Sequence, residues 1–150
     1  RWCRRVAQLL EDCWADGAAL DRGVLDDGVA RKVEVLVTCE SDEGGVEDCA
    51  LLAASAAIAA LENTPLVLHA APLTCAVTED GAVLADPSLD EASGCARATV
   101  VVGVDCSSGD ASSLLKVSVN GAMPAAALER CVALAAKRAA TIQWPHAMAD

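Results

Sequence analysis

The chain contains neither Phe nor Tyr, although 54% of its 150 residues are hydrophobic. Ala, Val and Leu dominate this hydrophobic fraction, so the core has to be filled by small aliphatic side chains. Such a core reaches the density of a protein interior only where backbones approach one another closely. The lack of Phe and Tyr also argues against a surface on which unpaired bases stack. The length fits one domain with enough chain to bury a core.

The periodicity of the apolar residues predicts an α+β domain in which helices pack on a mixed sheet. Asp16–Val29 contains Asp-Gly and Arg-Gly steps and is expected to be a loop. The predicted order is a helix at Trp2–Trp14, a strand at Arg31–Cys39, an Ala-rich helix at Gly44–Leu61, strands at Leu66–Val77, Val83–Leu84, Ala98–Val104 and Leu114–Val119, and a final helix opened by Met123 and Pro124.

Several of these elements carry more specific expectations. Arg31–Cys39 alternates apolar and polar side chains, which is typical of a half-covered strand. The strand at Leu66–Val77 is expected to break at Pro72, whereas the Val-rich run Ala98–Val104 indicates a strand covered on both faces. The apolar stripe of the final helix is expected to consist of Leu128, Cys131, Val132, Leu134 and Ala135.

The formal net charge of −11 comes from 22 acidic and 11 basic residues. Such a field repels free nucleic acid unless basic residues cluster locally. The basic residues cluster only weakly, and we interpret each small group as a solvated face: Arg1, Arg4 and Arg5; Arg31 and Lys32; Lys137 and Arg138.

The eight cysteines contain no Cys-x-x-Cys pair, so the sequence predicts no zinc site. Their apolar settings indicate reduced, buried thiols of an intracellular protein. His69 and His146 have no Cys or acid at metal-ligand spacing and are expected to be packing or surface residues. We predict no metal and no cofactor. No apolar run is long enough to span a bilayer, so no membrane partner is expected.

The stretch GGVEDCALLAASAAIAAL, Gly44–Leu61, places two carboxylates in the first turn of a helix that is otherwise built from small apolar residues. Glu47 and Asp48 suit this position by themselves, because carboxylates interact favourably with the positive end of a helix dipole. From the residues alone, the turn is interpreted as a capped helix start.

Three stretches together resemble a known domain: VEVLVTCESDEGGVEDCALLAASAAIAALENTPL, LTCAVTEDGAVLADPSLDEASGCARATVVVGV and LLKVSVNGAMPAAALERCVALAAKRAATI. Their order is similar to the second half of an RNase PH domain, and most similar to the RNase-PH-like ring subunits of the eukaryotic RNA exosome in the family numbered forty-six. The resemblance covers Val29–Ile142. It implies that residues 1–150 are a single domain, the C-terminal portion of an RNase PH-like (ribosomal protein S5 domain 2-like) domain without its N-terminal part.

The resemblance also identifies a position for a phosphate site. In phosphorolytic members the turn is close to Gly-Gly-Thr-Arg and offers N–H groups and a hydroxyl to phosphate at a helix N-terminus. The matching positions here are Gly45, Val46, Glu47 and Asp48. At about 4 Å, two like charges repel by about 1 kcal/mol in water and about 4 kcal/mol at an effective dielectric of 20. We therefore expect a degenerate site that does not bind phosphate.

Active members further carry a pair of aspartates after the central hairpin, associated with metal binding or with protonation of the leaving oxygen. Asp86 matches the first of them, and Ala92 stands where the second is expected. If the alignment is offset by a residue, Asp90 or Glu91 takes the position of the second aspartate. The residues alone favour Asp86 as a turn residue before proline. We accordingly predict no catalytic residue.

The resemblance implies a structural, non-catalytic subunit that completes the exosome ring and supports 3′–5′ RNA processing and degradation. Its expected partners are other RNase-PH-like ring subunits and cap subunits, with RNA as the substrate of the complex. The expected location is the nucleus, including the nucleolus, and the cytoplasm. One alternative is an active phosphate-dependent 3′–5′ exoribonuclease that uses phosphate and Mg²⁺. Another is a small α+β binding domain that only imitates the pattern.

Overall fold

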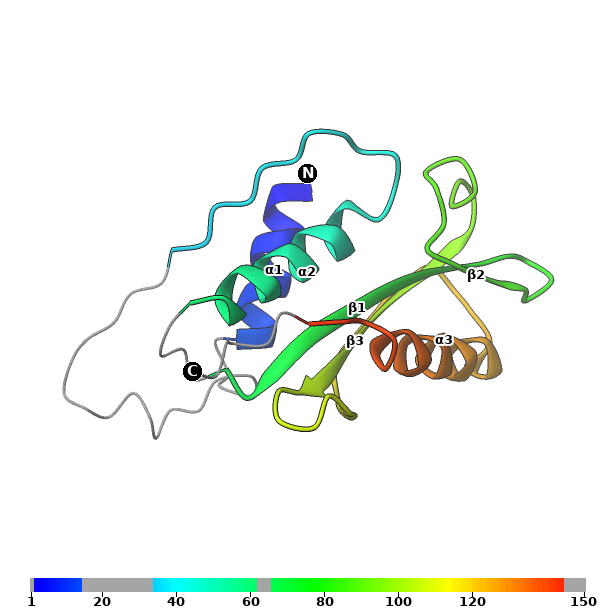
Figure 1. Ribbon diagram of the computed structural model, residues 1–150. Coiled ribbons are helices and arrows are strands. Elements are labelled where there is room, and N and C mark those ends of the chain that lie inside the picture. Colours follow the sequence, from blue (N-terminus) through cyan, green and yellow to red (C-terminus); the bar gives the residue numbers. More distant parts are fainter. Residues whose placement is uncertain (1, 15–33, 62–65, 145–150) are drawn as a thin grey trace.

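The structure, a computed structural model, describes residues 2–14, 34–61 and 66–144 (Figure 1). The predicted loop at 16–29 lies outside these residues, as do Arg1, Arg31, Lys32 and His146. The α+β fold is confirmed. Its elements are α1 (Trp2–Trp14), α2 (Val46–Ala59), β1 (Leu68–Val77), β2 (Val83–Ala85), β3 (Ala96–Asp105), β4 (Ala111–Asn120) and α3 (Ala125–Ala139).

The four described strands form one sheet in the order β2-β1-β3-β4. Every pair is antiparallel, with Thr74 opposite Thr99 in β1 and β3, and Val100 opposite Val117 in β3 and β4. The sheet was predicted to be mixed, which is wrong for these strands. Antiparallel pairing follows from the short connections, since a parallel neighbour requires a long crossover.

Helices cover both faces of the sheet (Figure 1). On one face, α3 packs against β1, β2 and β3. On the other, α2 packs on β1, and α1 packs against α2 and touches β4. Strand β3 is therefore buried on both faces, as its Val-rich run predicted, with Val100, Val102 and Val104 toward α3 and Val101 toward the other two helices.

The predicted strand at Arg31–Cys39 is wrong in its described part, because residues 34–39 have no strand structure. The side chain of Leu36 is 92% exposed. Alternation of apolar residues indicates a strand only where a neighbour supplies the backbone hydrogen bonds, and none of the described strands lies beside this segment. Residues 34–39 instead run as an extended connection toward α2.

Strand β1 continues through Pro72, which was expected to break it. Pro72 lies opposite Val101 of β3. Strand β2 pairs only with Cys75, Ala76 and Val77, so none of the described strands lies on the other side of β1 at Pro72. A proline that lacks its N–H group is tolerated at such an edge.

The helices pack through small residues, as the composition predicted. The buried positions of α3 are Ala127, Cys131, Ala135 and Ala139. Leu134 was predicted to belong to the apolar stripe but is exposed. In α2 the Ser55 hydroxyl donates to the Ala70 carbonyl oxygen at 3.4 Å, which brings the helix close to β1.

All eight cysteines are free thiols, but only Cys13, Cys75 and Cys131 are buried. The expectation of burial is wrong for Cys3 and Cys49, which are exposed on helices α1 and α2. His69 is a packing residue, as predicted, since its ring stacks on Trp144 with centroids 4.3 Å apart. No helix within the described residues is long and apolar enough to cross a membrane.

Candidate functional site

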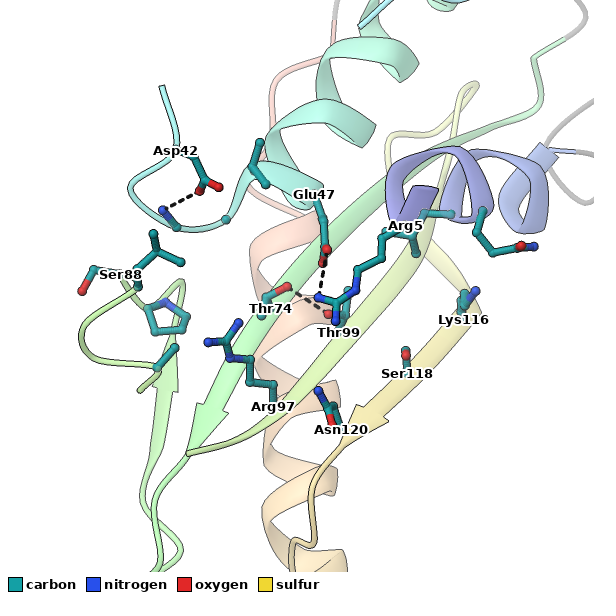
Figure 2. A pocket seen from close by; sticks show the side chains of 18 residues that line it. Arg5, Asp42, Glu47, Thr74, Ser88, Arg97, Thr99, Lys116, Ser118 and Asn120 are labelled. Carbon is teal, nitrogen blue, oxygen red and sulfur yellow. Dashed lines mark hydrogen bonds and ion pairs between the residues drawn. The ribbon is translucent and has the colours of Figure 1, made fainter. Parts of the chain in front are cut away.

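A cavity of about 530 Å³ lies between the start of α2, helix α1, the segment after β2, and the sheet (Figure 2). It brings together residues that are far apart in the sequence. Its wall includes Arg5, Gln8, Asp42, Gly44, Gly45, Val46, Glu47, Thr74, Ser88, Ala92, Arg97, Thr99, Lys116, Ser118 and Asn120. The predicted phosphate-site turn and Ala92 thus face one shared cavity.

The glycines of the turn have a structural explanation. Gly44 has φ 124°, and a Cβ atom there would lie 2.8 Å from the Pro87 carbonyl oxygen. The backbones are joined at this point, because the Leu89 N–H donates to the Glu43 carbonyl oxygen at 3.0 Å. Gly45 has φ 66° and forms the N-cap of α2. Tight contact with the 86–89 segment therefore requires glycine at Gly44, independently of any ligand.

The Glu47 carboxylate lies on the cavity wall and binds Arg5 of α1 (Figure 2). The Arg5 Nη1 atom donates to Glu47 Oε1 at 3.3 Å. The Glu47 side chain is 22% exposed, so this pair is partly removed from solvent. Glu47 adds negative charge to the cavity and engages one of its cations.

Asp48 is not part of the cavity wall, although it follows Glu47 directly. Its side chain is 1% exposed, and it points to β1. The Thr74 N–H donates to Asp48 Oδ2 at 2.6 Å, and the Thr74 hydroxyl donates to Asp48 Oδ1 at 2.9 Å. Burial raises the pKa of Asp48 above its ordinary value, while the two bonds from Thr74 oppose this shift. Asp48 attaches the start of α2 to the sheet.

The hydroxyl groups of Thr74 and Thr99 form the floor of the cavity. Their oxygen atoms are 3.0 Å apart. A hydroxyl has one proton to donate. Since the Thr74 hydroxyl donates to Asp48, the Thr99 hydroxyl is left to donate to Thr74. The Thr99 oxygen therefore presents only acceptor lone pairs to the cavity.

Three cationic and two carboxylate side chains line the cavity, a net of one positive charge: Arg5, Arg97 and Lys116 against Asp42 and Glu47. Lys116 forms an ion pair with Asp12 of α1. Arg5 is held by Glu47. Among the described residues, Arg97 has no such partner and is the cation left to meet a ligand.

Asp86 lies beside the cavity and does not line it. It has φ 54°, unusual for a residue other than glycine, and its N–H donates to the Thr74 carbonyl oxygen at 2.9 Å. Its Oδ2 atom is 3.6 Å from Arg138 Nη1 of α3. These contacts fit the turn role that the residues favoured.

Ala92 is buried and faces the cavity with a methyl group. Of its acidic neighbours, Asp90 and Glu91 are exposed and do not line the cavity. Glu91 accepts a hydrogen bond from the Ser88 N–H at 2.9 Å, which lowers the pKa of its carboxyl group. An offset that brings a carboxylate into the position of Ala92 is therefore not seen. The absence of catalysis and phosphate binding at these positions stays a prediction.

Two basic residues that were predicted to lie on solvated faces also make specific contacts. Arg138 is partly buried beside Asp86, and Arg5 lines the cavity although its side chain stays 61% exposed. Sequence reasoning also missed Thr74, Thr99 and Arg97. A signal was available, since the two threonines interrupt apolar runs, and these positions pair between the antiparallel strands β1 and β3.

The described residues contain no group of three or more His, Cys, Asp and Glu side chains that could hold a metal ion. The chemistry that the cavity can offer is thus hydrogen bonding from hydroxyl and amide groups, with one uncommitted guanidinium.

Residues 70–138 match the family described as 3′ exoribonuclease family, domain 2. Among solved structures, the chain is similar to that of rice (Oryza sativa) Rrp46, with a TM-score of 0.54 and 25% sequence identity. This likeness covers 65% of the present chain and 46% of the rice chain, so it spans less than half of the latter. Comparison with curated proteins gives no match. The predicted resemblance and fold are confirmed: residues 70–138 match the sequence of a 3′ exoribonuclease family domain 2, and the fold is similar to that of rice Rrp46.

Proposed function

We propose that the chain is a non-catalytic ring subunit of an RNA exosome and supports 3′–5′ RNA processing without cleaving RNA itself. The observation that carries the proposal is the position of Glu47. Its carboxylate lies on the wall of the cavity that the α2 turn, Ala92 and the sheet enclose. A phosphate at the same helix start would face this carboxylate, and like charges in a partly buried site repel by several kcal/mol, about 4 at an effective dielectric of 20.

Two further features support the loss of catalysis. The position matched to a catalytic aspartate carries the methyl group of Ala92. The carboxylate of Asp48 is fully engaged by Thr74 and does not reach the cavity. General acid catalysis needs a carboxyl group within hydrogen-bond reach of the reacting oxygen. Asp90 and Glu91, the acids beside Ala92 in the sequence, do not line the cavity.

The sheet offers a surface for ring neighbours, which we propose are other RNase-PH-like ring subunits, with cap subunits on the ring. Strand β4 lies at the edge of the sheet, and α3 does not extend over it. Leu114, Val117 and Val119 are consequently exposed on the α3 side of β4. An edge strand with apolar side chains is suited to pairing with another chain. We propose further that residues 1–150 form a single domain, the C-terminal portion of an RNase PH-like domain, and that the complex acts in nucleus and cytoplasm.

Incubation with end-labelled RNA and orthophosphate tests the proposal. We expect no nucleoside diphosphate above the level of a blank, with or without Mg²⁺. A bacterial-type phosphorolytic RNase PH assayed in parallel provides the positive control. Release of nucleoside diphosphates in proportion to the amount of this protein would overturn the proposal.

An active phosphate-dependent exoribonuclease is the second candidate. It is favoured by the net positive charge of the cavity and by the uncommitted guanidinium of Arg97. In that case Arg97→Gln would abolish phosphate-dependent RNA decay. Glu47→Gln would increase it, because the competing charge is removed.

A further inference from the structure

We infer that Glu47 excludes small oxyanions from the cavity, acting as an internal anion that pairs with Arg5. This inference rests on the proposed function, which it deepens by assigning the exclusion of phosphate to one residue. The two carboxylates at the start of α2 have different roles. Glu47 is on the cavity wall, whereas Asp48 is 1% exposed and is bonded to β1.

The Arg5–Glu47 pair joins two helices at the cavity wall (Figure 2). Arg5 belongs to α1, and Glu47 belongs to the first turn of α2. Both side chains line the cavity, so the guanidinium that could meet an external anion already meets an internal one. Removal of the Glu47 charge frees Arg5 and raises the net charge of the wall from one positive charge to two.

The freed Arg5 would not act alone. Arg97 of β3 lines the same cavity and has no ion-pair partner among the described residues. Beside them, Thr74, Ser118 and Asn120 supply short polar side chains. Two guanidinium groups in one partly enclosed cavity form a better environment for a small oxyanion than one, because charge-assisted hydrogen bonds are about twice as strong as neutral ones.

Titration of the whole chain with orthophosphate, followed by backbone amide NMR shifts, tests the inference. Glu47→Gln should bind orthophosphate at least about tenfold more tightly than the native chain, which corresponds to removal of a repulsion of about 1.4 kcal/mol. The largest shifts should map to Gly44, Gly45 and Val46. Glu43→Gln is the matched control, since it removes the same charge from an exposed residue that does not line the cavity.

Two double variants make the test specific. Adding Arg5→Gln or Arg97→Gln to Glu47→Gln should each remove the gained affinity. Equal affinity of the native chain and Glu47→Gln would contradict the inference, as would an equal gain from Glu43→Gln. Circular dichroism on every variant verifies that the helices are intact.

The outcome is separable from that of the proposed function. If Glu47→Gln gains no affinity while the native chain releases no nucleoside diphosphate, the role of Glu47 is wrong and the non-catalytic assignment stands. If the native chain releases nucleoside diphosphate and binds orthophosphate as tightly as Glu47→Gln does, both are wrong.

Discussion

The two faces of the sheet use the same strands in different ways. The face toward α3 is an apolar core of small residues, in which Ala98, Val100, Cys131 and Ala135 are buried. The opposite face is apolar only under α2 and the second half of α1, where Leu9, Cys13, Leu51 and Val101 meet. Beyond them it opens into the polar cavity.

The change from core to cavity occurs at the paired threonines. Leu73 and Cys75 of β1 point into the α3 core, and Thr74 between them points to Asp48. The alternation of a strand thus lets one face stabilise the domain while the other presents polar groups. Substitutions in the cavity on the second face can therefore change its chemistry with little effect on the core.

The largest expected loss of stability comes from a substitution on the face of the sheet that α3 covers. Leu73→Ala removes a buried side chain from the core and leaves a cavity, so the free energy of unfolding should fall by about 2–5 kcal/mol. Urea denaturation followed by circular dichroism measures it. Leu114→Ala on β4 is the control, because Leu114 is 52% exposed and its loss should cost much less. Similar losses in both variants would mean that α3 does not form the core described.

The second largest loss of stability is expected from a substitution of Gly44 in the turn before α2. Gly44→Ala introduces a Cβ atom 2.8 Å from the Pro87 carbonyl oxygen at φ 124°. Backbone strain alone costs about 1–3 kcal/mol, and the clash adds to it. Gly94→Ala gives the comparison, since Gly94 also has positive φ but has no atom within 4 Å of the added Cβ. Thermal melting should show the larger loss for Gly44→Ala. The reverse ranking would contradict close contact with the 86–89 segment.

The bond between α2 and β1 can be weakened without changing the size of a side chain. Asp48→Asn replaces one acceptor oxygen by an NH₂ group, so one of the two bonds from Thr74 is lost. The expected loss is about 1–3 kcal/mol in the free energy of unfolding. Asp90→Asn, at an exposed position, removes the same charge as a control. An unchanged urea midpoint for Asp48→Asn would show that Asp48 does not hold α2 on the sheet.

The pH dependence of stability distinguishes two aspartates whose pKa values shift in opposite directions on folding. Burial raises the pKa of Asp48 above the ordinary 3.8, so the folded state holds its proton longer, and stability falls as pH rises from 3.8 through the folded pKa. Bonds from Ser107 and Ser108 lower the pKa of Asp105 to about 2, so its contribution is lost as pH falls from 3.8 toward 2.

Urea midpoints measured from about pH 2 to about pH 7 check both signs. Asp48→Asn should reduce the loss of stability above pH 3.8, and Asp105→Asn should reduce the loss of stability as the pH falls below 3.8. The two variants should therefore alter different arms of the profile. If both variants altered the urea midpoint in the same direction and over the same pH range, the burial of Asp48 described above would be contradicted.

Periodicity predicted the helices well, because their apolar spacing reports burial directly. It failed for residues 34–39, where alternation was present but no described strand lies alongside to pair with them. The prediction that β1 breaks at Pro72 failed as well. Pro72 is tolerated because β2 is too short to pair with this part of β1, and the length of β2 could not be predicted from the sequence of β1. Both errors concern the pairing of strands, which depends on the neighbouring strand and cannot be read from the sequence of one strand alone.

The sequence predicted which segment contributes to the site, but it did not predict the role of each residue in that segment. The carboxylates of the α2 turn were recognised, but Glu47 and Asp48 could not be told apart, because only packing decides which of two adjacent helix residues faces the sheet. The role of Arg5 was missed for a similar reason. It is 42 residues from Glu47 in the sequence, and the docking of α1 on α2 brings them together.

A crystal of the native chain soaked in concentrated orthophosphate tests the central claim most directly. The account predicts that the Glu47 carboxylate remains bound to Arg5 and that no oxyanion appears on the amide groups of Gly45 and Val46. A phosphate held by those amides, with Glu47 displaced and Arg5 turned to the phosphate, would contradict it.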